Sequence, residues 1–172
     1  MMCPSRLALL ITMALGINAV TLQDLMSALH TFEKVWVRYR SYERSTLGHK
    51  HTCLYNEVRS HRQTSYLFTQ HYEVDLKWRS QQVYASVFQG KRGETVMRLS
   101  QRPGTYGVDH TLVFWHPVEH CFVFTRIFEG KRHCEMWVWG DHVRKHVPQC
   151  QLAYKRHCSP QYPVYTHACG PP

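Results

Sequence analysis

Alternation of apolar and polar residues dominates this chain from about residue 33 onward. Valine, phenylalanine, tyrosine, tryptophan and threonine recur at every second position in short segments, a pattern typical of half-buried β-strands. Eight segments show it: Glu33–Arg40, Thr52–Val58, Ser65–Val74, Gln82–Phe88, Thr95–Ser100, Thr111–His116, His120–Phe128 and Arg132–Trp139. In the first, the alternation sets Val35, Val37 and Tyr39 on one face and Trp36, Arg38 and Arg40 on the other.

The connections between these segments predict the topology. Most are short and carry turn signals such as Gly90-Lys91-Arg92-Gly93 and Arg102-Pro103-Gly104. They leave no room for crossover helices, so successive strands must pair antiparallel. Eight up-and-down strands can close into a barrel that holds one small ligand. We therefore predict an all-β fold, an eight-stranded antiparallel up-and-down β-barrel.

Two short helices are expected beside the barrel. Thr21 is a suitable N-cap for a helix over Leu22–Leu29. Pro148 stands at the favoured first position of a second helix, over residues 148–157. The tail after it, Tyr162–Cys169, is expected to be extended and tied down by its cysteine.

Residues 1–19 have the pattern of a cleaved signal peptide. Arg6 precedes the apolar run Leu7–Leu15, and small residues end at Ala19. The run is shorter than the roughly 20 residues of a membrane span. We expect a secreted protein with one domain over residues 20–172 and no membrane span.

Cysteine number supports the extracellular assignment. Cleavage would remove Cys3, one of seven cysteines, and leave six. An even number in an oxidising compartment indicates disulfides, and six cysteines allow 15 pairings. The six are Cys53, Cys121, Cys134, Cys150, Cys158 and Cys169.

The chain is basic, with a formal net charge of +9. Pairs such as Lys91-Arg92 and Lys131-Arg132 lie beside turn signals and are explained by solvated loop ends. The alternative is attraction to an anionic surface such as a glycosaminoglycan or a phospholipid. We expect a monomer and no nucleic-acid partner.

A set of motifs in the cysteine-rich half is more specific. The chain carries Trp36 in its first strand, Thr52-Cys53-Leu54-Tyr55, Cys134-Glu135-Met136-Trp137 and Val147-Pro148-Gln149-Cys150. With these motifs it resembles the salivary lipocalins of ticks, a group that includes histamine-binding proteins and the immunomodulatory Japanin type. The resemblance covers nearly the whole mature chain.

The resemblance implies a lipocalin barrel with the C-terminal helix packed on it. It also implies the disulfides Cys53–Cys169 and Cys121–Cys150. With these two in place, the third pair would be Cys134–Cys158.

Amine-binding members of the family carry Cys-Asp-aliphatic, then Glu-Leu-Trp/Tyr, then Cys. This chain keeps the spacing, Glu135 and Trp137, but has Phe122 in place of the aspartate. A protonated amine inside a barrel needs a carboxylate, because a buried unpaired charge is costly. The substitution therefore argues for a neutral lipid over histamine.

Glu135 is the centre of the candidate ligand site. If it points inward as in the family, Trp137 and Trp139 share its face, and Phe122 and Phe124 share a face of the preceding strand. The ligand-binding candidates are Glu135, Trp137, Trp139, Phe122, Phe124 and Trp36. The alternative is that the rings fill a closed core and that Glu135 forms a structural ion pair with an arginine such as Arg126.

Catalysis and metal binding have little support in the sequence. His142 and His146 are four residues apart but lack the glutamate of a zincin motif, and His116 and His120 lie beside Cys121, which we expect to be oxidised. Gly-x-Ser-x-Gly, phosphate-loop and Cys-x-x-Cys motifs are absent. We expect no enzymatic activity, no cofactor and no metal site.

Three functional hypotheses follow. The first is a secreted lipocalin that sequesters a hydrophobic host ligand, such as a sterol, an eicosanoid or another lipid mediator, and so modulates host inflammation or immunity. The second is a scavenger of histamine or serotonin. The third is a protein whose outer surface engages a host immune protein or receptor.

Overall fold

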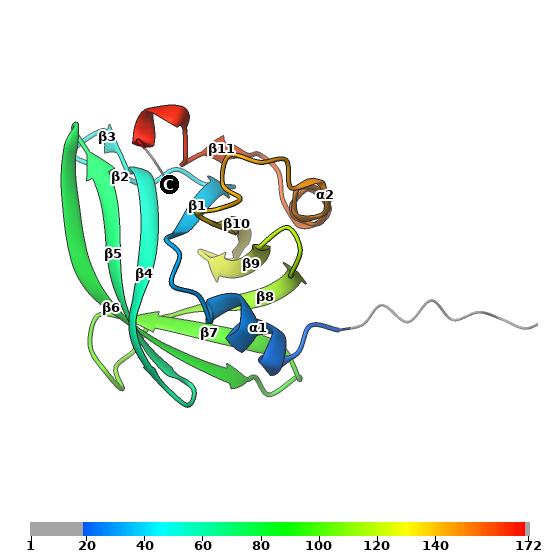
Figure 1. The fold of residues 1–172 in the computed structure, drawn as a ribbon. Coiled ribbons are helices and arrows are strands. Elements are labelled where there is room, and N and C mark those ends of the chain that lie inside the picture. The colour runs from blue at the N-terminus through cyan, green and yellow to red at the C-terminus, as the bar shows by residue number, and fades with distance from the viewer. Residues whose placement is uncertain (1–18, 171–172) are drawn as a thin grey trace, which may run out of the picture.

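Eight strands form a single closed antiparallel barrel in the computed structural model, which describes residues 19–170. They are β1 (Val35–Arg40), β4 (Thr52–Arg62), β5 (Ser65–Val74), β6 (Lys77–Gln89), β7 (Thr95–Ser100), β8 (Val108–His116), β9 (Cys121–Phe128) and β10 (Lys131–Trp139). Each strand pairs with the next along the chain, and β1 pairs with β10 to close the barrel (Figure 1). The predicted fold is confirmed. The expected signal peptide lies outside the described residues except for Ala19.

Two of the strands are longer than predicted. We expected Thr52–Val58 and Gln82–Phe88, but β4 runs on to Arg62 and β6 begins at Lys77. The turn before β6 consists of Asp75 and Leu76, both with left-handed φ values of 52° and 56°. Such a two-residue turn matches the twist of a hairpin, but it usually carries asparagine or glycine. Without that signal, and with Lys77–Ser80 exposed, the sequence shows no strand there.

Smaller elements were not predicted. A hairpin of β2 (Ser45–Thr46) and β3 (His49–Lys50) follows β1. The tail, which we expected to be extended, forms β11 (Tyr162–Pro163) along β1 and then a 3-10 turn over His167–Cys169.

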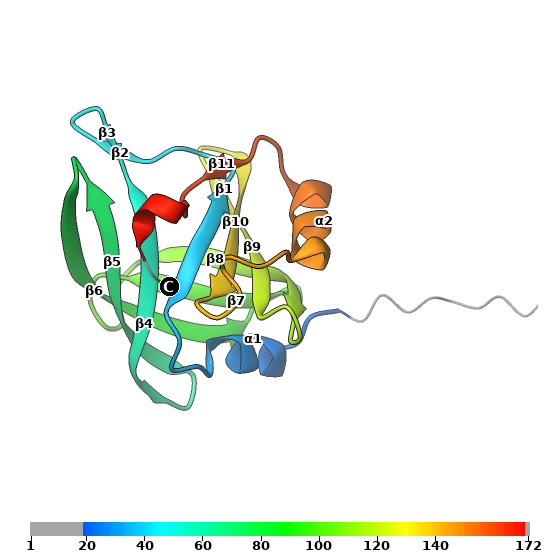
Figure 2. The ribbon, with the colours of Figure 1, turned by 45° about the horizontal axis from the view of Figure 1, so that its top comes forward.

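Helix α1 (Leu22–Leu29) covers one end of the barrel. Thr21 and Asp24 form a capping box at its start, and Leu25, Ala28 and Leu29 are buried against the barrel core. Trp139 Nε1 donates to Ala28 O over 2.9 Å. Figure 2 shows α1 at one end of the barrel and the β2–β3 hairpin at the other. The barrel is therefore closed at the α1 end.

Helix α2 (Pro148–His157) packs on the outer face of β8, β9 and β10 over a second apolar cluster. The three disulfides are Cys53–Cys169, Cys121–Cys150 and Cys134–Cys158, which confirms the expected pairing. They fix α2 and the tail to the barrel wall. Among the described residues, no helix has the length and apolar character needed to cross a membrane.

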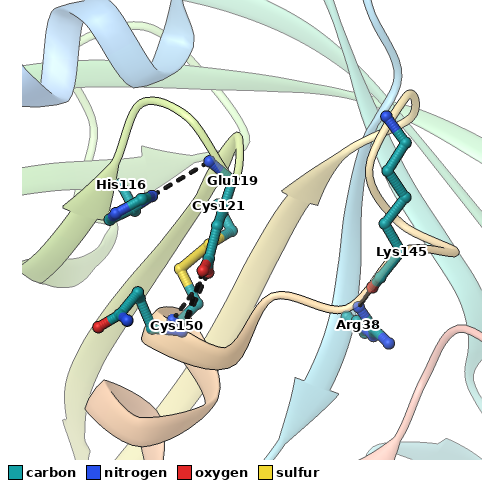
Figure 3. The surroundings of a disulfide bond; sticks show 7 residues. Arg38, His116, Glu119, Cys121, Lys145 and Cys150 are labelled. Atoms are coloured by element: carbon teal, nitrogen blue, oxygen red, sulfur yellow. Dashed lines mark hydrogen bonds between the residues drawn. A yellow bond between two sulfur atoms is a disulfide. The ribbon is translucent and has the colours of Figure 1, made fainter.

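The N-terminus of α2 is capped by a distant residue. Val147, at the N-cap position, offers no side-chain hydrogen bond, and Pro148 has no N–H. The carboxylate of Glu119, in the β8–β9 turn, accepts from Gln149 N and Cys150 N at 3.1–3.3 Å (Figure 3). Glu119 thus satisfies free N–H groups that every helix start leaves, with a charge that suits the helix dipole.

Candidate ligand-binding site

The open end of the barrel leads into a cavity of about 230 Å³. Leu54, Val83, Leu99 and Trp137 form apolar walls, and Glu135 lies among them. An outer space of about 500 Å³ adjoins this inner cavity. The lining residues common to both are Tyr42, Arg44, Val108 and Arg126. The combined space is of the size that small ligands occupy in proteins.

One wall of the inner cavity is polar. Gln81 Nε2 donates to Gln70 Oε1, and Gln70 Nε2 donates to Asn56 Oδ1, each over 3.0 Å. Both glutamines line the cavity. Their amides can meet a hydroxyl or carbonyl group of a ligand, so the interior is not a purely hydrocarbon space.

Glu135 is buried, with 4% of its surface exposed. Trp137 Nε1 donates to Oε2 over 2.7 Å, and the Tyr42 hydroxyl donates to Oε1 in a short hydrogen bond. Arg40 Nε lies 3.6 Å from Oε1. Both carboxylate oxygens are therefore already engaged by protein groups.

The surroundings of Glu135 keep it ionised. Burial raises the pKa of its carboxyl group, but Arg40, His110 and the hydrogen bonds from Tyr42 and Trp137 outweigh this and lower the pKa to about 2. Burial and the neighbouring Glu135 raise the pKa of Tyr42, which stays a neutral donor. Burial lowers the pKa of His110. The network is thus a carboxylate compensated by one guanidinium and two neutral donors.

A β-bulge places Arg40 in this network. The sequence alternation put Arg40 on the face of Trp36, which the structure places outside the barrel. The pairing of β1 with β10 shifts between Val37 and Tyr39, and Arg40 then stands opposite Glu135. A bulge of this kind reverses which side chains face inward beyond it. The ion-pair partner of Glu135 is accordingly Arg40 and not Arg126.

Arg126 is a cavity-lining residue and not the ion-pair partner of Glu135. It lines both the inner and the outer space, and its Nη1 donates to the Tyr42 hydroxyl over 3.3 Å. Its Nε is buried without a hydrogen-bond partner among the described residues. Arg44 lines both spaces as well. In the inner cavity two guanidinium groups therefore face one carboxylate, which is already paired with Arg40.

The structure separates the six candidate residues into three groups. Glu135 and Trp137 line the cavity. Phe122 and Phe124 are fully buried behind Trp137, with ring centroids 5.7 and 5.3 Å from it. These two phenylalanines fill the core beside the cavity and are not among its lining residues.

The other two candidates lie farther away. Trp139 lies at the closed end, 5.7 Å from Trp115 and hydrogen-bonded to α1. Trp36 is not in the barrel: its ring packs on Tyr55 and Tyr165 at 4.6 and 4.9 Å in the outer apolar cluster. Its place in β1 follows from alternation, since Val35 and Val37 on either side of it point inward.

The sequence analysis did not predict that Arg40, Tyr42 and His110 belong to the site. Tyr42 lies just beyond the end of β1, in a segment with no periodic signal. His110 was outside the predicted strand Thr111–His116. Only the closure of the barrel brings these three side chains to Glu135.

Within residues 19–170, two groups of side chains bring three potential metal-ligand atoms close together. Glu119 lies near Cys121 and Cys150, but these cysteines are joined in a disulfide and cannot ligate. His120, Asp141 and His142 form the second group. The helical pairing of His142 with His146 is not formed, because residues 140–146 form turns and irregular chain.

Comparison with known proteins gives a consistent result. The tick histamine-binding protein family matches residues 18–171. The serotonin complex of AM182 is 14% identical, with a TM-score of 0.64 over 86% of this chain and 92% of that chain. Japanin from Rhipicephalus appendiculatus, bound to cholesterol, is 14% identical, with a TM-score of 0.57 over 78% of this chain and 92% of that chain.

At these identities the two structures establish the fold alone. No curated protein sequence matches the chain significantly. The family match spans almost the whole chain, and it agrees with the closed eight-stranded barrel and the three disulfides. The chain belongs to the tick histamine-binding protein family of salivary lipocalins.

Proposed function

We propose that this protein is a secreted lipocalin that sequesters a small hydrophobic host ligand in its barrel and so lowers the host's inflammatory or immune response. The ligand is a lipid mediator of the eicosanoid type or a sterol, with at least one hydrogen-bond acceptor. The protein acts by binding this ligand and not by catalysis. The observation that carries this proposal is the engagement of Glu135 by Arg40, Tyr42 and Trp137.

The engaged carboxylate disfavours an amine. An ammonium group taken out of water needs an anion with free acceptor capacity. To use Glu135, it would have to displace Arg40 or Tyr42, and it would then approach Arg126 as well. Phe122, where the family's amine pattern has an aspartate, supplies no second anion.

Arg126 favours a ligand with an acceptor. Its buried Nε lacks a partner within the described chain, and an unsatisfied buried charged donor is unfavourable until an acceptor reaches it. A carboxylate would gain a charge-assisted hydrogen bond there. The apolar walls around Leu54, Val83 and Trp137 would then hold the hydrocarbon part of the ligand.

An amine remains the second candidate function. Glu135 and Trp137 do lie together in the cavity, as the family's amine pattern requires, and the AM182 neighbour is a serotonin complex. Japanin, with the same fold, holds cholesterol. Both ligand classes thus occur on this architecture, so the choice between them depends on the side chains that line the cavity.

Calorimetry on the refolded mature protein tests the proposal. Arachidonic acid, cholesterol, serotonin and histamine are titrated in parallel. We expect binding of one of the two lipids and weak or absent binding of both amines. Tight histamine or serotonin binding without lipid uptake would refute the proposal and support the second candidate.

A pair of variants locates the site. Arg126→Gln should weaken a carboxylate lipid by about 1–3 kcal/mol, the scale of a hydrogen bond to a charged group. Arg132→Gln is the matched control, since Arg132 is exposed on the neighbouring strand β10 and does not line the cavity. Equal effects of the two substitutions would show that only surface charge matters.

A further inference from the structure

A second cluster of functional groups lies at the closed end of the barrel, away from the ligand cavity. His120 Nδ1 is 2.8 Å from Asp141 Oδ2, and His142 Nδ1 is 3.0 Å from Asp141 Oδ1. The two imidazole rings are 4.5 Å apart between centroids. One ligand atom of each of the three side chains lies within 4.8 Å of the others.

The backbone holds this cluster in place. Trp139 N donates to His120 O, and His142 N donates to Trp139 O, each over 2.9 Å. The next residue after His120 is Cys121, fixed by its disulfide to Cys150. On the other side Val143 is buried, with 1% exposure. The three side chains are therefore brought together by anchored backbone and not by a mobile loop.

We propose that His120, Asp141 and His142 bind a divalent transition-metal ion such as Zn²⁺. Two imidazoles and a carboxylate are a donor set that such borderline ions accept, whereas Mg²⁺ prefers oxygen ligands. Metal–nitrogen and metal–oxygen bonds of roughly 2.0–2.2 Å in tetrahedral geometry hold the donors about 3.3–3.5 Å apart. The two nitrogen–oxygen contacts, 2.8 and 3.0 Å, are somewhat shorter than this spacing. Three protein ligands leave a coordination position for water or another molecule.

Two observations independent of the clustering support a cation here. His142 Nδ1 is buried but has no hydrogen-bond partner among the described residues, since its approach to Asp141 does not have hydrogen-bond geometry. In the described chain, Asp141 also forms no ion pair with a lysine or arginine. The site thus offers a buried nitrogen without a hydrogen bond, beside a carboxylate that pairs with no lysine or arginine of residues 19–170.

A carboxylate that binds a metal ion must be ionised, and an imidazole that binds one must be neutral. Metal binding must therefore weaken in acid, because protons compete for both histidines.

The metal site is separate from the proposed ligand site. Trp139, whose indole lies 4.3 Å from the His120 ring, is bonded to α1 at the closed end, opposite the cavity mouth. Failure of metal binding would leave the lipid proposal intact, and the reverse also holds.

Calorimetry with ZnCl₂ on the EDTA-treated mature protein is the first test. We expect one Zn²⁺ per chain with micromolar affinity near neutral pH, a loss of at least about tenfold near pH 5.5, and no heat with Mg²⁺. Absence of Zn²⁺ binding to the wild-type protein would overturn the proposal.

Variants show which residues bind the Zn²⁺ ion. His142→Gln and Asp141→Asn should each weaken Zn²⁺ binding by at least about tenfold, since even changes outside the ligand shell cost that much. His146→Gln is the matched control, an exposed histidine of the same segment outside the cluster. Equal Zn²⁺ binding by wild type, His142→Gln and Asp141→Asn would assign the ion to others of the 13 histidines and overturn the proposal.

A spectroscopic measurement distinguishes the loss of a metal ligand from misfolding of the variant. Co²⁺ added to the wild-type protein should give a d–d absorption of a four- or five-coordinate site, and Asp141→Asn should lack it while keeping the far-ultraviolet circular dichroism of the barrel. If Asp141→Asn kept the Co²⁺ spectrum, Asp141 would not be a ligand and the site as proposed would be wrong.

Discussion

At the scale of single residues, Glu135 is the centre of the polar network in the cavity. Its two oxygens accept from Trp137 and Tyr42 and lie beside Arg40, all in a buried setting. A carboxylate engaged in this way stabilises the protein's own interior and has little capacity for a ligand cation. Arg126 lines the cavity, and its buried Nε has no hydrogen-bond partner among the described residues.

Substitution of Glu135 separates a structural role from a ligand role. Glu135→Gln keeps the shape but leaves Arg40 as an uncompensated buried charge, so the free energy of unfolding should fall by about 3 kcal/mol. Lipid affinity should be nearly unchanged. Urea denaturation and lipid calorimetry on the same variant measure both quantities. Unchanged stability with lost binding would instead make Glu135 a ligand residue.

A double variant checks the cause of that loss. Arg40→Met removes the guanidinium, and Glu135→Gln combined with Arg40→Met should recover much of the lost stability, because a buried pair can often be replaced by uncharged groups at little cost. If the double variant is no more stable than Glu135→Gln alone, the ion pair is not the source of the effect.

Glu135 also predicts a pH dependence. The pKa of the Glu135 carboxyl group is about 2 in the folded protein, whereas the ordinary value of 4.5 applies in the unfolded chain. The unfolded chain therefore binds the proton more readily. The stabilisation from Glu135 is therefore fully present above about pH 4.5 and is lost as the pH falls toward about 2. Denaturation of wild type and Glu135→Gln between about pH 6 and pH 2 should show curves that converge in acid. Parallel curves would contradict the assigned pKa.

At the scale of elements, α2 depends on a cap supplied from another part of the chain. Glu119 accepts from the first free N–H groups of α2, and Arg38 Nη1 donates to Lys145 O over 2.7 Å in the segment before it (Figure 3). The helix lacks a capping side chain of its own at Val147. Its start is thus fixed by the barrel wall.

Removal of this cap should destabilise the protein measurably. Glu119→Ala is expected to lower the free energy of unfolding by about 1 kcal/mol, the usual effect of losing an N-cap. Glu33→Ala, at an exposed position before β1, is the matched control and should change it by less than about 0.5 kcal/mol. Thermal or urea denaturation gives both values. Similar losses for the two variants would show that the cap contributes nothing specific.

At the scale of the whole molecule, three disulfides hold the tail and α2 on a barrel that is closed at one end by α1. They span 116, 29 and 24 residues of sequence, and all three end in the segment from Cys150 to Cys169. This arrangement leaves the barrel mouth, formed by Tyr42, Arg44, Val108 and Arg126, as the route to the inner cavity.

The disulfides should contribute unequally. In the chain-entropy model, Cys53–Cys169 stabilises by about 5 kcal/mol and Cys134–Cys158 by about 3.5 kcal/mol, because the first closes a longer loop. Replacing Cys53 and Cys169 by alanine should therefore cost more than replacing Cys134 and Cys158. Urea denaturation of the two double variants measures this order, and the reverse order would contradict the entropic account. Thiol titration of the unfolded, unreduced mature protein should find no free thiol.

The sequence alone determined much of this protein. Period-two alternation defined eight strands and their antiparallel order, and Thr21 and Pro148 marked helices that begin where predicted, because these signals are local. The motif around Glu135 placed Glu135 and Trp137 on one face, and the family resemblance supplied the disulfide pairs.

Only the tertiary structure decided the chemistry of the sites. The bulge in β1 turned Arg40 inward and so made Arg40, in place of the suggested Arg126, the ion-pair partner of Glu135. Counting alternate residues cannot detect an extra residue in a strand. His120, in one turn, met Asp141 and His142, in another, because the ladder between β9 and β10 aligns these turns. Such contacts depend on register and closure, which are properties of the whole barrel and not of any single segment of sequence.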